Sequence, residues 1–427
     1  MKILGIIAEY NPLHNGHIYQ IKKAKELTGA DYTVICMSGN FVQRGEPAIL
    51  DKWTRSRLVL DCDPSEQGNA DLVFELPFVY ACNRAHYFAK GAVNMLAGVG
   101  VTHISFGCET DDFQGLIDLA SGMRENADEL SEMRIRHMED GASFAKATEL
   151  AIRELFGPEA AELVQGPNNI LSIEYLKCIQ ELEEQGIHIE PVPVQRYVSG
   201  INEANSALGF AGSTEIRRLI SENYFDETVK YMPGRVCLAL SEGVNPVVGI
   251  RSSNEKLFEL VRYNILMRLP EELAEIYCVG EGLENKMKKE IAHVNSPEQL
   301  IEALTSRRYP AAAIKRMLIY VLLGLTGKTA DFLTGITEEG DEKSPVLYAR
   351  VLAAGLKGQE LLRLIKDEGL NSIPVLTNIN KEINEDDNPE MSLLLAVDSV
   401  ATDMYNALYG RNIYDYSDKV VTPYMEK

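Results

Sequence analysis

Residues 3–17, which read ILGIIAEYNPLHNGH, decide the fold of this chain. The apolar run Ile3–Ala8 is typical of a buried strand, and the Asn-Pro pair that follows is typical of a turn. Beyond the turn, apolar residues recur at helical spacing over residues 18–27. The pattern therefore predicts a strand, a tight turn and a helix, with His14 and His17 at the turn.

The two histidines suit a phosphate-binding site. A helix N-terminus offers unpaired N–H groups and the positive end of the helix dipole. Imidazoles at this point can donate hydrogen bonds to phosphate oxygens, and Gly16 lets the backbone approach a ligand closely. The alternatives are a metal site or a surface pair without function. A metal would need a third ligand, and no further His or Cys lies nearby in the sequence, so we expect no metal.

Further apolar runs predict a parallel sheet. They cover residues 33–37, 72–76, 103–106 and 189–194. Helical stretches such as residues 88–96 lie between them, and alternating strands and helices predict a parallel sheet covered on both faces. Pro191 and Pro193 indicate that the last run lies at an edge of the sheet or at a strand end. Ligands bind such sheets at the carboxyl ends of the strands, where both histidines are expected.

The second half of the chain is predicted to be mainly helical. Residues 109–163 form a charge-rich helical excursion between two strands, and the strand signal fades beyond about Asn223. Residues 254–330 and 346–427 have the pattern of amphipathic helices, with a break at 338–345. We therefore expect an α/β protein with a Rossmann-like parallel sheet and a mostly helical C-terminal region. The predicted domains are residues 1–225, with a helical insertion at about 110–163, and residues 226–427.

Composition restricts the class of protein. The chain has 427 residues, a net charge of −21 and no apolar run long enough to cross a membrane. Its first residues lead directly into a strand without a cleavage site, so we expect no signal peptide. Its seven cysteines are odd in number and scattered without a CxxC pair, which indicates reduced thiols. We expect a cytoplasmic protein with no membrane partner.

The acidic net charge argues against a nucleic-acid partner, but the charge is uneven. Residues 1–60 hold eight basic and five acidic residues, and residues 301–330 hold five basic residues and one acidic residue. An acidic protein with two local basic zones can still bind RNA through them. The alternative is that these residues form a solvated helix face, and composition alone favours that alternative.

A second phosphate-binding motif lies about 200 residues after the first. The segment GSTEIR covers residues 212–217 and opens a stretch with helical apolar spacing. Ser213 or Thr214 can cap this helix, and the same N-terminus can bind phosphate with Arg217 as a bidentate donor. A capped helix is the simpler interpretation of this segment alone. Two half-sites for one triphosphate are stronger evidence than either motif by itself.

The two motifs resemble the HxGH and SSTxIR signatures of the nucleotidyltransferase superfamily. Three further blocks, MSGNFVQRGEPA at 37–48, FGCE at 106–109 and GPNNIL at 166–171, resemble the tRNA(Met) cytidine acetate ligase family over nearly the whole chain. The sequence departs from that pattern at Gly212 and Cys108, where serine is expected.

The resemblance implies a ligase that activates acetate with ATP. Acetyl-adenylate and pyrophosphate would form first, and the acetyl group would then pass to the wobble cytidine of elongator tRNA(Met). Mg²⁺ is expected to accompany ATP, and the oligomeric state stays open. Two alternatives remain. One is a small-molecule nucleotidyltransferase that adenylylates a phosphorylated metabolite; the other is a non-catalytic RNA-binding protein with a relic nucleotide site.

The resemblance also implies roles for individual residues, with His14 and His17 as the catalytic pair. The residues expected to bind ATP are Ile7, Ala8, Glu9, Tyr10, Asn11, Pro12, Leu13, His14, Asn15, Gly16, His17, Ile18, Tyr19, Gln20, Gly107, Asn168, Arg196, Ser213, Thr214 and Arg217. Asn169 is the rival of Asn168, and one of the pair is expected to cap a helix. The candidates for tRNA binding are Arg44, Lys52, Arg55, Arg307, Arg308, Lys315 and Arg316.

Overall fold

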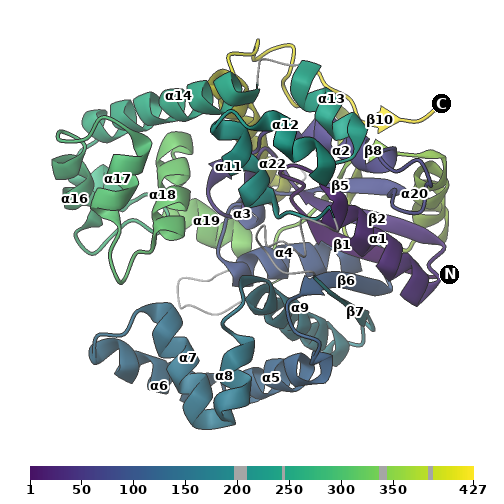
Figure 1. Cartoon of the computed structure of the whole chain (residues 1–427), viewed down its shortest axis with the longest axis horizontal. Helices are drawn as coiled ribbons and strands as arrows, with labels where there is room; N and C mark the ends of the chain where they lie inside the picture. Colours follow the sequence, from purple (N-terminus) through teal and green to yellow (C-terminus); the bar gives the residue numbers. More distant parts are fainter. Residues whose placement is uncertain (197–208, 243–245, 336–343, 383–387) are drawn as a thin grey trace.

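A sheet of eight strands organises the part of the molecule that holds both termini, at the right of Figure 1. The computed structural model describes residues 1–196, 209–242, 246–335, 344–382 and 388–427. The strands of the sheet are β1 (Ile3–Ala8), β2 (Tyr32–Ser38), β5 (Leu72–Leu76), β6 (His103–Cys108), β7 (Glu190–Gln195), β8 (Ala349–Ala354), β9 (Val375–Leu376) and β10 (Tyr424–Met425). Their order is β10-β8-β5-β2-β1-β6-β7, with β9 beside β8.

The five strands of the first half are parallel, as the sequence predicts. β5, β2, β1, β6 and β7 follow one another in register, with Ile6 of β1 opposite Ile35 of β2 and Ser105 of β6. The proline-containing strand β7 lies at the edge of the sheet, which confirms the expectation from Pro191 and Pro193. The carboxyl ends of β1 and β6 are therefore neighbours.

Helices cover both faces of the sheet because successive strand residues point to opposite sides. Leu4 and Ile6 pack in one core cluster with apolar residues of α1 (Asn15–Thr28), α2 (Lys52–Leu60), α11 (Ser213–Ser221) and α13 (Gly234–Glu242). Ile3 packs in the other cluster with α3 (Phe78–Ala81), α4 (Ala85–Gly98) and α9 (Pro167–Glu184).

The last part of the chain returns to the sheet, which corrects the expectation that residues 346–427 are helical. β8 is fully buried and runs antiparallel to β5, with Leu72 opposite Ala354. Its sequence ARVLAA is rich in alanine and buried on both faces, so it lacks the alternation that reveals a strand. The neighbouring helices are α20 (Leu356–Glu368), α21 (Ile379–Glu382) and α22 (Pro389–Leu408).

Two groups of helices extend from the sheet (Figure 1). The predicted insertion forms α5 (Phe113–Glu125), α6 (Ala127–Glu139), α7 (Phe144–Phe156) and α8 (Pro158–Leu163). The second group, which we call the helical lobe, contains α14 (Pro246–Met267), α15 (Pro270–Ala274), α16 (Leu283–Glu290), α17 (Pro297–Leu304), α18 (Ala311–Leu323) and α19 (Gly327–Thr334). Arg307 donates to the carbonyl of Gly141 at 3.1 Å, so the lobe touches the insertion.

The remaining short elements are α12 (Phe225–Thr228), the 3₁₀ helix at Val229–Tyr231, and the hairpin of β3 (Phe41–Val42) and β4 (Glu46–Pro47). The break predicted at 338–345 falls mostly outside the described residues. The division at residue 225 stays a prediction, although β8 and β10 complete the sheet of the first half. Among the helices described, none is long and apolar enough to span a membrane.

Candidate active site

A cavity of about 480 Å³ opens at the carboxyl ends of β1 and β6. The residues that line it come from both predicted motifs and from neighbouring elements. They are Ile7, Ala8, Glu9, Tyr10, His17, Gln20, Val42, Gln43, Arg44, Phe88, Phe106, Gly107, Pro167, Asn168, Leu171, Tyr175, Arg196, Gly212, Ser213, Thr214, Glu215 and Arg217. The volume is that of a small-molecule site, for which about 300–1,000 Å³ is usual.

The two histidines cap α1 reciprocally. His14 is the N-cap, and its Nδ1 accepts a hydrogen bond from the N–H of Gly16 at 3.1 Å. The Nδ1 of His17 accepts from the N–H of His14 at 3.2 Å. The rings stack with their centroids 3.7 Å apart. This capping box orients both rings at the helix start.

The caps determine which ring nitrogens carry the protons. Because each Nδ1 accepts, each neutral ring must hold its proton on Nε2. Burial lowers the pKa of His14 to about 3 and lowers the pKa of His17 well below its ordinary value, so both rings are uncharged near neutral pH. The Nε2 of His14 is buried, with no hydrogen-bond partner among the described residues. Each histidine therefore presents an N–H donor.

The second motif lies beside the first because α11 contacts the turn that follows β1. Arg217 donates from Nη1 to the carbonyl of Asn11 at 2.6 Å, and Ser213 donates to the carbonyl of Pro12 at 3.3 Å. The expected cap by Ser213 or Thr214 is wrong, because Gly212 is the N-cap and no side chain caps α11. The first N–H groups of α11 are thus left without a side-chain acceptor at the cavity.

The other end of the cavity is built by β6, β7 and α9. Asn168 accepts from Arg196 Nη1 at 2.7 Å and donates to Glu109 at 2.6 Å. Asn169 instead accepts from the N–H of Glu109 at 2.7 Å, and the N-cap of α9 is Gly166 without a side-chain cap. The expectation that one of these asparagines caps the helix is therefore wrong. Gly107 has no room for a side chain, because a Cβ would lie 2.6 Å from Cδ of Arg196.

Several residues that line the cavity were not among those predicted to bind ATP. They are Val42, Gln43, Phe88, Phe106, Pro167, Leu171, Tyr175, Gly212 and Glu215. Helical spacing contained a signal for two of them: Leu171 and Tyr175 lie three and seven positions after Asn168 and so share its face of α9. The loop after β2 reaches the cavity only in the tertiary fold, so its residues could not be found from sequence spacing.

Part of the predicted ATP segment faces away from this cavity. His14, Gly16 and Tyr19 line a small cavity of about 50 Å³ on the side of Gly212, and Gln20 lines both cavities. The other predicted residues that do not line the larger cavity are Asn11, Pro12, Leu13, Asn15 and Ile18. Asn11 accepts from the N–H of Ile49 at 2.8 Å, and Leu13 is in the core.

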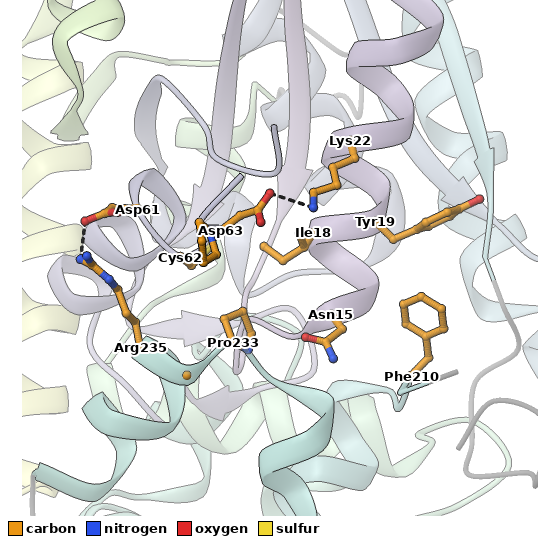
Figure 2. A pocket seen from close by; sticks show the side chains of 12 residues that line it. Asn15, Ile18, Tyr19, Lys22, Asp61, Cys62, Asp63, Phe210, Pro233 and Arg235 are labelled. Atoms are coloured by element: carbon orange, nitrogen blue, oxygen red, sulfur yellow. Dashed lines mark hydrogen bonds and ion pairs between the residues drawn. The ribbon is translucent and has the colours of Figure 1, made fainter. Parts of the chain in front are cut away.

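A wider hollow of about 740 Å³ lies on the outer side of α1 (Figure 2). Its charged groups are already paired: Lys22 with Asp63 at 2.9 Å, and Arg235 with Asp61. Asn15 donates to two backbone carbonyls there. This hollow is larger than the cavity at the strand ends, but its polar groups are engaged with one another and it contains no part of the GSTEIR motif.

Two of the predicted tRNA-binding residues are inside the protein. Lys52 and Arg55 are each 0% exposed. Lys52 pairs with Glu75 and Asp418, and Arg55 donates to backbone carbonyls, among them Ser38 at 3.1 Å. The expectation that they bind tRNA is corrected, because their charges are enclosed in the core.

The remaining basic candidates lie at or near the surface. Arg44 is exposed and donates to Thr214 at 3.4 Å at the cavity. Arg307 and Arg308 are exposed in the loop before α18. Lys315 and Arg316 are half-buried on α18, where Arg316 donates to the carbonyl of Gln43 at 3.3 Å.

One carboxylate joins the phosphate motif to the helical lobe. Glu46 pairs with Arg217 at 3.1 Å and with Lys315 of α18. Burial opposes ionisation of Glu46, but Arg217 and Lys315 outweigh it and lower its pKa. The two basic zones therefore meet beside the cavity, which sequence spacing could not reveal.

The described residues contain no group of three or more His, Cys, Asp or Glu side chains arranged to hold a metal. All seven cysteines are free, and burial raises the pKa of Cys108 to about 12. The arrangement offers neutral donors, helix N–H groups and arginines to an anionic ligand, and no activated thiol.

Known proteins resemble the chain over its whole length. The family model for HIGH nucleotidyl transferases matches residues 1–419. A tRNA(Met) cytidine acetate ligase from Thermoanaerobacter sp. (strain X514) is 36% identical over 411 residues, 96% of each chain. Another from Acetivibrio thermocellus is 33% identical over 420 residues, 96% of this chain and 95% of that one.

Solved structures agree with these relatives. Thermotoga maritima TmcAL bound with alpha-thio ATP aligns with a TM-score of 0.83 at 26% identity, covering 100% of both chains. The apo form of the same protein aligns with a TM-score of 0.84 at 27% identity, again over 100% of both chains.

Proposed function

This chain belongs to the tRNA(Met) cytidine acetate ligase family of HIGH nucleotidyltransferases, and on that premise we propose that it is a ligase that uses ATP to acetylate a cytidine of tRNA(Met). The observation that carries the proposal is the convergence of His17, Arg217 and the open N-terminus of α11 on one cavity at the strand ends. Such a group of donors suits a triphosphate.

The reaction has two steps. A carboxylate oxygen of acetate attacks the α-phosphate of ATP, and pyrophosphate leaves. The acetyl group of the resulting acetyl-adenylate then passes to the exocyclic amine of the wobble cytidine in elongator tRNA(Met), and AMP leaves. Charge builds on the phosphate oxygens in the first step. His17 and the N–H groups of α11 are assigned to stabilise it from the cavity, and Arg217 is assigned to the phosphates. His14 is assigned the same role from the small cavity, which shares Gln20, Arg196 and Gly212 with the larger one.

The far end of the cavity is assigned to the nucleoside. Gly107 leaves room for the side chain of Arg196 against β6, and Arg196 donates a hydrogen bond to Asn168 there. Phe106 and Leu171 supply apolar surface for the base. Residues 1–225 are thus assigned to ATP, and the helical lobe to tRNA.

Mg²⁺ is expected to accompany ATP. The described residues contain no cluster that would hold the ion by itself, so the phosphates are its natural ligands. When bound, the ion would neutralise charge on the triphosphate, while the protein residues bind and orient the nucleotide.

The tRNA is assigned to the exposed basic residues of the two basic zones. Arg44 lies at the cavity, and Arg307 and Arg308 lie where the lobe touches the insertion. Elsewhere an acidic chain repels phosphate, so these arginines would position the anticodon loop. Because tRNA is the substrate, we place the enzyme in the cytoplasm.

The test combines ATP–pyrophosphate exchange with transfer of label to RNA. We expect exchange that depends on acetate, and incorporation of labelled acetate into a tRNA(Met) transcript but not into one with uridine at the wobble position. Exchange that depends on a phosphorylated metabolite, or none with any acid, would contradict the proposal.

A further inference from the structure

Glu9 is a carboxylate at the cavity to which the reaction outlined above gives no chemical role. It directly follows β1, and its side chain lines the 480 Å³ cavity. Its Oε1 accepts a hydrogen bond from the N–H of Gln43 at 2.8 Å. Its backbone carbonyl accepts from Nη1 of the buried Arg55. Glu9 is therefore held from both its main chain and its side chain, with one carboxylate oxygen engaged by the loop after β2.

Burial and the neighbouring groups change the pKa of Glu9 in opposite directions. The Gln43 N–H lowers this pKa, as do Arg217, Arg44 and Arg55. Burial has the larger effect and raises the pKa of Glu9 above its ordinary value. The phenol of Tyr175 and the thiol of Cys82 also face it, and both are uncharged near neutral pH because burial raises their pKa values. A carboxylate in such a place is a stronger base than one in water.

The transfer step needs a proton acceptor. When the exocyclic nitrogen of cytidine attacks the acetyl carbon, the N–C bond forms, and that nitrogen must lose a proton as the bond from carbon to the AMP oxygen breaks. The two histidines are poor acceptors, since each Nδ1 already accepts a backbone N–H and each Nε2 carries the proton. The second carboxylate at the cavity, Glu215, pairs with Arg218 on α11.

We propose that Glu9 is the general base of acetyl transfer: it takes the proton from the exocyclic amine of cytidine while AMP leaves from the acetyl carbon. The inference rests on the proposed function and deepens it. The carboxyl proton is returned to water after AMP and the acetylated tRNA leave, so the step needs no further reactant. Activation of acetate does not require this base, because an acetate ion has no proton to lose.

The experiment separates the two steps with Glu9→Gln. Glutamine keeps an oxygen that can accept from the N–H of Gln43 but removes the base. We expect transfer from synthetic acetyl-adenylate to tRNA(Met) to fall by about 10²–10⁴-fold, a much larger loss than that of acetate-dependent ATP–pyrophosphate exchange. The transfer rate of the unmodified protein should rise with pH through the pKa of Glu9, and Glu9→Gln should lose that rise.

Glu26→Gln is the matched control, since it removes an exposed carboxylate of α1 that pairs only with Lys23 among the described residues. It should leave both steps and the pH profile unchanged. Glu9→Asp should recover part of the transfer rate and shift its pH profile, which a purely structural role would not do.

Equal loss of exchange and transfer in Glu9→Gln would overturn the inference, because it would place Glu9 in the activation step. Unchanged transfer from synthetic acetyl-adenylate would also overturn it. Absence of acetate-dependent exchange and of acetyl transfer in the unmodified protein would instead overturn the proposed function, and the inference with it.

Discussion

Substitution of Lys52 by methionine tests how the two halves of the chain are held together. Lys52 lies on α2 in the first half, whereas two of its partners, Asp418 and Thr402, come from the last residues of the chain. Its Nζ is 2.7 Å from Glu75 and 2.9 Å from Asp418, and the side chain has no exposed surface. Methionine has a similar length but no charge, so Lys52→Met leaves the carboxylates in place.

The expected loss follows from the partners that remain. Removal of one partner from a buried ion pair costs about 3–5 kcal/mol, since the other charge stays buried and unpaired. Arg350 still contacts Asp418 at 2.6 Å and Glu75 at 3.3 Å, so we expect the lower end, about 3 kcal/mol. The loss should shrink as the pH falls. Protonation then neutralises Asp398, a carboxylate that also interacts with Lys52 and whose pKa burial raises to about 7.

The assay is chemical unfolding followed by far-UV circular dichroism, with the free energy of unfolding compared at pH 8 and pH 5.5. Lys23→Met is the control, because Lys23 and Glu26 form a largely exposed pair on α1 whose loss should cost at most about 1 kcal/mol. If Lys52→Met costs no more than the control, the argument that this ion cluster fastens the C-terminal segment to the sheet is refuted.

Three further outcomes are expected. His17→Ala should remove about 2–4 kcal/mol of transition-state stabilisation, which is measured as slower ATP–pyrophosphate exchange. Unfolding is checked separately, because His17 also takes part in the cap of α1. Undiminished exchange would contradict the role of His17. The double substitution Arg307→Gln and Arg308→Gln should weaken tRNA binding and leave ATP affinity unchanged. The slope of log affinity against log salt concentration should become shallower by about 0.7–0.9 for each phosphate that is no longer neutralised. An identical slope would show that both arginines only face solvent. Burial lowers the pKa of His14 from 6.5 to about 3. The stability that its neutral ring contributes is therefore complete above pH 6.5 and is lost as the pH falls toward 3. His14→Gln should accordingly flatten the acid limb of a plot of unfolding free energy against pH.

The local parts of the site followed from the sequence. The strand, the turn and α1 lie where residues 3–28 predict them, and the capping box joins His14 to residues two and three positions away. Spacing and residue type revealed the strand, the turn and the helix, because such elements depend on neighbouring residues, whereas the capping box was not predicted. The parallel direction of the first five strands also followed, because buried strands that alternate with helices are typical of parallel sheets, whereas their order was not predicted.

Tertiary structure alone decided which charges are available and what encloses the cavity. Lys52 and Arg55 have the sequence context of surface cations, yet their partners Asp418 and Ser38 lie 366 and 17 positions away. β8 could not be recognised because an alanine-rich strand buried on both faces has no alternation, and its pairing with β5 joins Leu72 to Ala354. The physical reason is the same in each case: burial and pairing depend on segments that meet only after folding, whereas a sequence pattern records only the preferences of its own residues.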